Sequence, residues 1–94
     1  MIKRIVKLTI REEEIPEFLA LFESSKKQIR NFPGCQHLEL WRSRQNPGIF
    51  FTYSIWSAEK DLELYRQSSL FREVWSKTKT FFADKPDAWS LEQI

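Results

Sequence analysis

The chain has 94 residues, a length typical of one domain, so we take residues 1–94 as a single domain. Hydrophobic residues make up 41% of the chain and aromatic residues 15%, which argues against intrinsic disorder and leaves apolar surface for a core and an interface. The 15 basic and 13 acidic residues are interspersed, and the net charge of +2 offers no basic stripe to nucleic acid.

Two different periodicities predict the first strand and the first helix. Apolar and polar residues alternate over residues 2–10, which predicts a strand, and Arg4 falls on its more apolar face. Pro16 suits the first turn of a helix, and Pro33-Gly34 would end that helix. The expected buried stripe consists of Phe18, Leu21, Phe22, Ser25, Ile29 and Phe32.

A hairpin of two strands is predicted next. Residues 35–44 and 49–56 favour strands, and the Asn46-Pro47-Gly48 sequence between them is typical of a turn. The first of these strands has Leu38 and Leu40 on one face and Cys35, His37, Glu39 and Trp41 on the other. The second strand is bulky on both faces, with Phe50, Thr52, Ser54 and Trp56 on one side and Ile49, Phe51, Tyr53 and Ile55 on the other.

The remainder of the chain predicts a bent helical region and a short last strand. Ser57 is a suitable N-cap for the helical region, and the Ser68-Ser69 pair is expected to break or re-cap it. Residues 88–93 favour the last strand.

The element order βαββαβ predicts a ferredoxin-like α+β fold. Two strand-helix-strand units give a four-stranded antiparallel sheet with both helices packed on one face. No third layer remains in the chain to cover the other face, which must carry bulky side chains, either Phe51, Tyr53 and Ile55 or else Phe50 and Trp56. Pairing with a second copy is the simplest solution, so we expect a two-fold homodimer.

Several classes of site are excluded by residue counts. The chain has two glycines, Gly34 and Gly48, and both fall in predicted turns, so no dinucleotide fingerprint or phosphate-binding loop can be built. One histidine and one cysteine cannot supply a zinc or copper set. We therefore expect no metal and no cofactor.

The expected location is cytoplasmic, without a membrane partner. The first residues enter a strand pattern at once, without the apolar segment of a signal peptide. No apolar run approaches the length of about eighteen residues that a membrane span needs. Cys35 has no second cysteine to pair with, which agrees with a reducing compartment.

Few residues are available for acid-base chemistry. His37 could act as a general base, and Glu39 on the same strand face could accept a proton if a partner buried it and raised its pKa. Trp56, Tyr65 and Trp75 could line a flat slot between the sheet and the second helical region. The alternative interpretations are a packed or surface residue for His37, a surface cross-strand pair for Glu39, and ordinary core packing for the aromatic residues.

Several short motifs, taken in order, resemble one family. They are Phe32-Pro33-Gly34-Cys35, Glu39, Asn46-Pro47-Gly48 before an aromatic strand, and Trp56-Ser57-Ala58-Glu59 leading to Leu62, Ser68 and Phe71. Over nearly the whole chain this pattern is similar to the antibiotic biosynthesis monooxygenases, which are dimeric α+β barrels. The resemblance implies oxidation of phenolic or quinol-like rings by dioxygen, without metal or flavin.

Some positions depart from the family pattern. An asparagine is expected four residues before the matching Trp56, but this chain has Thr52 there. Many members have histidines where this chain has Tyr65 and Leu70. The asparagine, tryptophan and histidine of haem-degrading relatives correspond to Val6, Tyr65 and Trp75, so haem ligation is not expected.

The resulting hypothesis is a cofactor-independent monooxygenase that acts on a small hydrophobic aromatic substrate. The candidate catalytic residues are Tyr65, Glu39 and His37, and the candidate substrate-binding residues are Trp56, Thr52, Trp75, Leu62 and Phe71. A non-catalytic dimeric module that binds an aromatic metabolite, or an isomerase of the same superfamily, remains an alternative. An RNA-recognition domain shares the element order, but Pro47 replaces the basic residue expected before the glycine and the first strand has no stacking aromatic residue.

Overall fold

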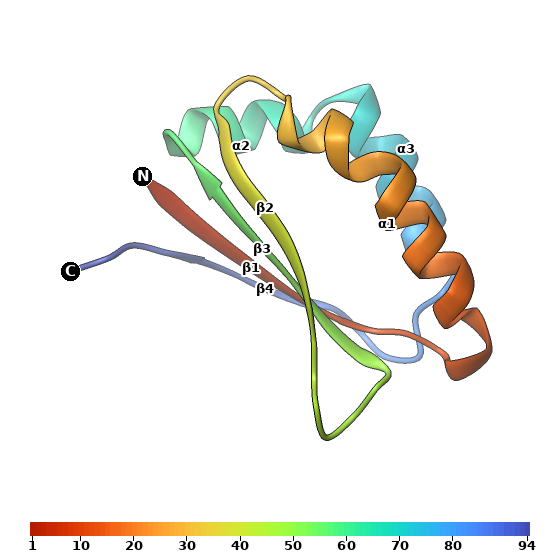
Figure 1. Cartoon of the computed structure of the whole chain (residues 1–94). Helices are drawn as coiled ribbons and strands as arrows, with labels where there is room; N and C mark the ends of the chain where they lie inside the picture. Colours follow the sequence, from red (N-terminus) through yellow and green to blue (C-terminus); the bar gives the residue numbers. More distant parts are fainter.

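The computed structural model describes residues 1–94 and has two layers, with the helices over one face of a single sheet (Figure 1). In chain order the elements are β1 (Ile2–Thr9), the 3-10 turn η1 (Glu12–Glu14), α1 (Ile15–Arg30), β2 (Cys35–Arg42), β3 (Ile49–Trp56), α2 (Glu59–Arg66), α3 (Ser69–Lys79) and β4 (Asp87–Leu91).

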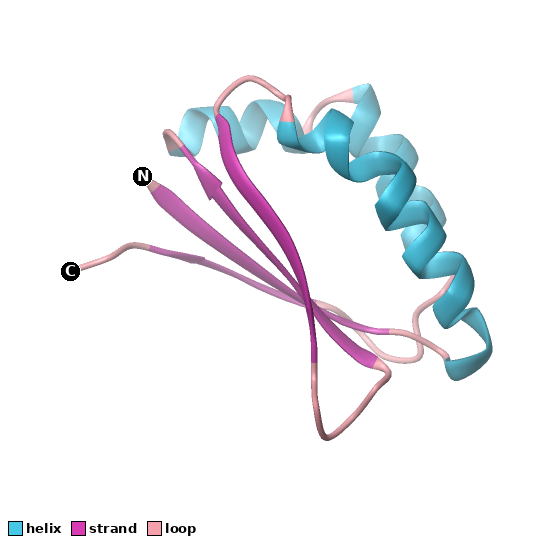
Figure 2. Ribbon diagram, viewed as in Figure 1, coloured by secondary structure: helices cyan, strands magenta, loops and turns pink.

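The four strands form an antiparallel sheet in the order β2-β3-β1-β4. In this register Ile5 of β1 stands between Tyr53 of β3 and Trp89 of β4. Figure 2 shows the helices gathered on one side and the other side of the sheet uncovered. This arrangement confirms the predicted ferredoxin-like α+β fold.

The first helix and the turn after it follow the sequence signals closely. Pro16 lies in the first turn of α1, where its missing N–H costs no hydrogen bond. The helix ends at Arg30, so Phe32 lies beyond it instead of completing the helical stripe. Gly34 has a φ of 89°, a left-handed conformation that glycine adopts without strain.

The predicted bend in the second helical region is a complete break between α2 and α3. The Ser68 Oγ atom accepts a hydrogen bond of 3.1 Å from the backbone N–H of Phe71, which caps α3. Ser57 does not cap α2, because the helix begins after Ala58. The Ser57 hydroxyl instead accepts a hydrogen bond of 2.6 Å from Gln36 Nε2.

An irregularity at the start of β2 changes the predicted face of Cys35. The register shifts between Cys35 and His37, so the strict alternation of the strand is lost at that point. Cys35 is therefore buried against Trp56 and Leu62 on the helix side, whereas His37 stays on the uncovered side.

The buried core lies between the sheet and the helices in two clusters. One comprises Leu8, Ile10, Phe18 and Phe50, and the other comprises Cys35, Trp56 and Leu62. None of the helices is long and apolar enough to cross a membrane.

Candidate functional site

A cavity of about 320 Å³ opens between the sheet and all three helices. Its floor is the helix-facing side of β1 and β3, and its roof is formed by the helices. Side chains from both core clusters border it, including Leu8 and Phe18 from one and Trp56 and Leu62 from the other. The volume lies within the usual range for small-molecule sites.

The structure brings six of the predicted site residues together around this cavity. They are Trp56 and Thr52 from β3, Leu62 and Tyr65 from α2, and Phe71 and Trp75 from α3. Alternation along β3 explains why Thr52 and Trp56 face the cavity, and helical spacing explains the rest.

Aromatic rings form a continuous wall along one side of the cavity. Trp56 stacks on Tyr65 with ring centroids 4.9 Å apart, and Tyr65 meets Phe71 edge to face at 5.2 Å. Phe71 then stacks on Trp75 at 5.7 Å. Flat apolar surfaces of this kind suit a planar ring, since aromatic pairs favour offset stacking and edge contacts.

Some polar side-chain atoms around the cavity have a hydrogen-bond partner within the chain, and others do not. The indole N–H of Trp56 donates to Ser54 Oγ at 3.0 Å, so this donor is occupied. The hydroxyl groups of Tyr65 and Thr52 form no side-chain hydrogen bond within the chain, although both residues border the cavity. These two hydroxyls are therefore free to contact a ligand.

Burial makes the Tyr65 hydroxyl harder to ionise than a tyrosine in water. Desolvation raises the pKa of the Tyr65 hydroxyl well above its usual range, and the nearby Cys35 raises it further. At neutral pH this hydroxyl is a hydrogen-bond donor and not a base.

Two arginines border the cavity, and the sequence interpretation gave them no role. Arg4 lies half-buried on β1, and its Nη1 donates to Ser90 Oγ at 2.9 Å. Arg66 is more exposed and pairs with Glu63 at 3.1 Å. Burial lowers the pKa of Arg4, Arg66 lowers it further, and Glu63 partly opposes both.

A sequence signal for Arg4 existed in the alternation of the first strand. A charged residue at an otherwise apolar register position faces the helices and not water. Arg66 has a weaker signal, since it directly follows Tyr65 on a helix whose apolar positions are few.

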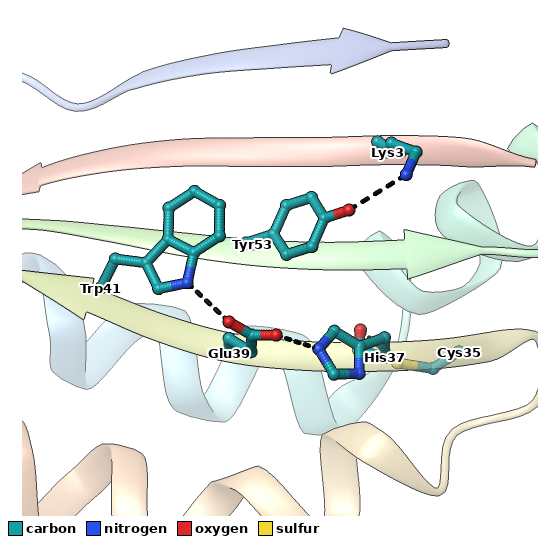
Figure 3. A network of polar contacts seen from close by, with 6 residues as sticks. All are labelled: Lys3, Cys35, His37, Glu39, Trp41 and Tyr53. Carbon is teal, nitrogen blue, oxygen red and sulfur yellow. Dashed lines mark hydrogen bonds and ion pairs between the residues drawn. The ribbon is translucent and has the colours of Figure 1, made fainter. Parts of the chain in front are cut away.

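His37 and Glu39 lie on the opposite face of the sheet and do not reach this cavity. Figure 3 shows them in a row along β2, with Trp41 beside them and Tyr53 on the neighbouring strand. They therefore lie apart from Tyr65, on the face opposite Leu38 and Leu40 that alternation predicted, and their catalytic role stays a prediction. Successive side chains of a strand point to opposite faces, and β2 presents these two to the uncovered side.

The groups on this face bond to one another. Glu39 contacts His37 Nε2 through one carboxylate oxygen and accepts a hydrogen bond of 2.7 Å from Trp41 Nε1 through the other. These bonds, the one to His37 first, lower the pKa of Glu39 from its usual value. Lys3 Nζ donates to the Tyr53 hydroxyl at 3.2 Å, and the Tyr53 ring stacks on Trp41 with centroids 4.8 Å apart.

No group of three or more His, Cys, Asp or Glu side chains is placed to hold a metal ion.

Comparisons with known proteins agree with this architecture. A crystal structure described as an antibiotic biosynthesis monooxygenase superimposes with a TM-score of 0.93 at 19% identity, covering 100% of this chain and 99% of that one. A conserved protein from Methanosarcina mazei Go1 gives a TM-score of 0.94 at 19% identity, covering 99% and 92%. Rv0793 from Mycobacterium tuberculosis gives 0.90 at 15% identity, covering 99% and 94%. At such identities these likenesses establish the fold alone.

The family comparison is more specific than the structural ones. No curated protein sequence gives a significant match to the chain. The sequence model of the antibiotic biosynthesis monooxygenases, however, matches residues 1–76, which include β1, the β2-β3 hairpin and most of the helical layer. The chain therefore belongs to the antibiotic biosynthesis monooxygenase family.

Proposed function

We propose that this protein is a cofactor-independent monooxygenase that oxidises a quinol-type or anthrone-type aromatic molecule inside the cavity. The observation that carries the proposal is the continuous ring wall of Trp56, Tyr65, Phe71 and Trp75, with the free hydroxyls of Tyr65 and Thr52 beside it. A planar substrate would stack on the wall, and its oxygen atoms would meet these hydroxyls.

The reaction balances without a further reductant. For a methylene carbon flanked by aromatic rings, two C–H bonds and the O–O bond break. One oxygen atom becomes the new carbonyl oxygen, and the other leaves as water with the two hydrogens. All four electrons that reduce dioxygen come from the substrate, so the protein has to orient the ring and exclude bulk water.

Tyr65 is the residue to which we assign a direct role. Its neutral hydroxyl can donate to a substrate oxygen on which negative charge develops as the ring loses a proton. Thr52 offers a second hydroxyl on the facing strand. His37 and Glu39 would take part only if a second copy brought a ligand to the other face of the sheet.

The experiment measures oxygen consumption with a panel of quinols and anthrones. We expect turnover by the wild type and a decrease of about tenfold or more in kcat/KM for Tyr65→Phe, as is typical for loss of one transition-state hydrogen bond. Tyr53→Phe is the matched control, because Tyr53 is the other tyrosine and lies on the opposite face. Absence of turnover with every substrate, or equal rates for both variants, would contradict the proposal.

A second candidate function is a non-catalytic module that binds an aromatic metabolite. The observation in its favour is that Tyr65 stays protonated and the one histidine faces away from the cavity, so neither of these two candidates acts as a base there. Its signature would be a large thermal shift with aromatic ligands and no product. Detection of an oxidised product would exclude it.

We also propose that the protein forms a homodimer through the uncovered face of the sheet. Trp41, Trp89 and Leu91 expose large apolar side chains on this face, and the half-buried Phe51 and Ile55 extend the same patch. Burying them against a second copy would remove a contiguous apolar surface from water, and a two-fold arrangement would be self-complementary.

A further inference from the structure

We propose that the cavity takes a planar aromatic ligand that carries a carboxylate, and that the Arg4 guanidinium holds the carboxylate. This inference rests on the proposed function in treating the cavity as the ligand site, and it adds the charge of the ligand. Arg4 stands where the floor of the cavity meets β4, the edge strand.

Arg4 has hydrogen-bonding capacity that the protein leaves unused. A guanidinium has five N–H donors, and the one side-chain bond that Arg4 forms within the chain is to Ser90 Oγ. It takes part in none of the five ion pairs of the chain. A half-buried cation without a carboxylate partner is unfavourable, because burial removes water that no opposite charge replaces.

The immediate surroundings of Arg4 leave room for a ligand. Its two neighbours across the sheet are Ser54 on β3 and Ser90 on β4, both small. The Ser54 hydroxyl is engaged by the indole of Trp56. A carboxylate could therefore approach the guanidinium in the two-pronged geometry that arginine and carboxylate groups favour.

Charge around Arg4 is also unbalanced in the direction that favours an anion. Arg66 borders the same cavity and is close enough to lower the pKa of Arg4 further, after the larger effect of burial. Glu63 compensates Arg66 through their ion pair. Asp87 borders the cavity as well, but it forms no ion pair with either arginine. A ligand carboxylate would supply the missing counter-charge.

The aromatic wall and the arginine together define the shape of the ligand. Trp56 links the two, because its ring stacks on Tyr65 while its N–H reaches the serine beside Arg4. A ring lying in the cavity against the half-buried Tyr65 and Phe71 would direct one substituent to Arg4 and leave another edge near the Tyr65 hydroxyl. Charge recognition and the proposed chemistry would thus occur at separate points on the same ligand.

The test is isothermal titration calorimetry with naphthoate and with naphthamide, its neutral analogue of nearly equal shape, at pH 7 and low salt. We expect the wild type to bind naphthoate about tenfold more tightly, as charge-assisted hydrogen bonds are stronger than neutral ones. Arg4→Gln should lose this preference, chiefly because its affinity for naphthoate falls, and Arg4→Lys should retain part of it. Arg72→Gln, an exposed arginine on α3 outside the cavity, is the matched control and should retain all of it.

Three results would overturn the inference: equal affinities of the wild type for the two compounds, an unchanged preference in Arg4→Gln, or no binding of either compound. The wild-type comparison decides the matter even if Arg4→Gln does not fold, and thermal unfolding reports whether it does. Naphthoate preference without oxygen consumption on any quinol would sustain this inference and contradict the monooxygenase proposal. Turnover of neutral quinols by a protein without that preference would do the reverse.

Discussion

Individual polar atoms around the cavity fall into two groups, those that the protein satisfies and those that it leaves for a ligand. Ser54 is central to this division. It accepts the indole N–H of Trp56, and both side chains are buried, so neither group can turn to water instead. Tyr65 and Thr52 have no such partner and can exchange a cavity water for a ligand oxygen.

Removing the Ser54 hydroxyl should therefore destabilise the fold. We expect Ser54→Ala to lower the free energy of unfolding by about 1–3 kcal/mol, the cost of leaving a buried donor unsatisfied. Urea unfolding at pH 7 measures this change. Ser24→Ala is the matched control, because the Ser24 hydroxyl is exposed and bonds to a carbonyl of its own helix, and its effect should stay within about 0.5 kcal/mol. Equal effects of the two variants would show that the indole bond contributes little.

The raised pKa of Tyr65 predicts how the free energy of unfolding changes at alkaline pH. The unfolded chain ionises this tyrosine near pH 10, whereas the folded chain holds its pKa higher. The free energy of unfolding is thus unaffected by Tyr65 below about pH 10 and falls as the pH rises above it, by at most ~1.4 kcal/mol per pH unit. Tyr65→Phe should show a shallower decline in urea unfolding between pH 9 and pH 11. An identical decline would mean that Tyr65 ionises as freely in the folded state.

At the scale of elements, the turn between α1 and β2 positions the aromatic wall. Phe32 leaves the end of α1 and packs edge to face on Tyr65 at 5.4 Å, and Gly34 then turns the chain into β2. An added Cβ at Gly34 would overlap the Asp61 side chain of α2. The turn therefore brings β2 and α2 into close approach.

Gly34→Ala should be strongly destabilising, because it combines a positive φ with this overlap. We expect a loss of about 2–4 kcal/mol in the free energy of unfolding, together with weaker ligand binding. Gly34→Asn separates the two causes, since asparagine tolerates positive φ but also carries a Cβ. Urea unfolding of both variants measures this. Near-native stability of Gly34→Asn would show that the backbone angle matters and the overlap does not.

Sequence patterns predicted the helices and strands well where a segment follows a single periodicity. They predicted the ends of these elements less well. Alternation along β3 placed Thr52 and Trp56 on the cavity side. The same rule failed at Cys35, because the register shift there depends on how β2 pairs with β3. The residues around Cys35 carry no sequence pattern that would predict such a shift. Alternation placed His37 and Glu39 opposite Leu38 and Leu40, but it does not tell which face of a sheet the helices will cover.

For the whole molecule, the uncovered face predicts self-association. We expect light scattering at micromolar concentration to give twice the chain mass of 11.4 kDa. Leu91→Glu should weaken the dimer by placing a charge in a surface that would be buried. Leu64→Glu is the matched control, because Leu64 on α2 is 51% exposed and Leu91 is 46% exposed, yet Leu64 lies away from the sheet.

A wild-type mass of one chain would contradict the homodimer. Equal dissociation by the two variants would show that association uses another surface. A mass of two chains for Leu64→Glu together with one chain for Leu91→Glu is the pattern that supports pairing through the sheet.

Strand β3 contributes side chains both to the cavity under the helices and to the uncovered face of the sheet. Its even-numbered residues from Phe50 to Trp56 point to the helix side, where Thr52, Ser54 and Trp56 border the cavity, and its odd-numbered residues from Ile49 to Ile55 point to the uncovered face. Under the two proposals above, mutations at even positions would affect the ligand site and mutations at odd positions would affect the dimer. Thr52 is the half-buried position of the even set, so an engineer could vary it to alter the cavity while leaving the odd set and the buried core untouched.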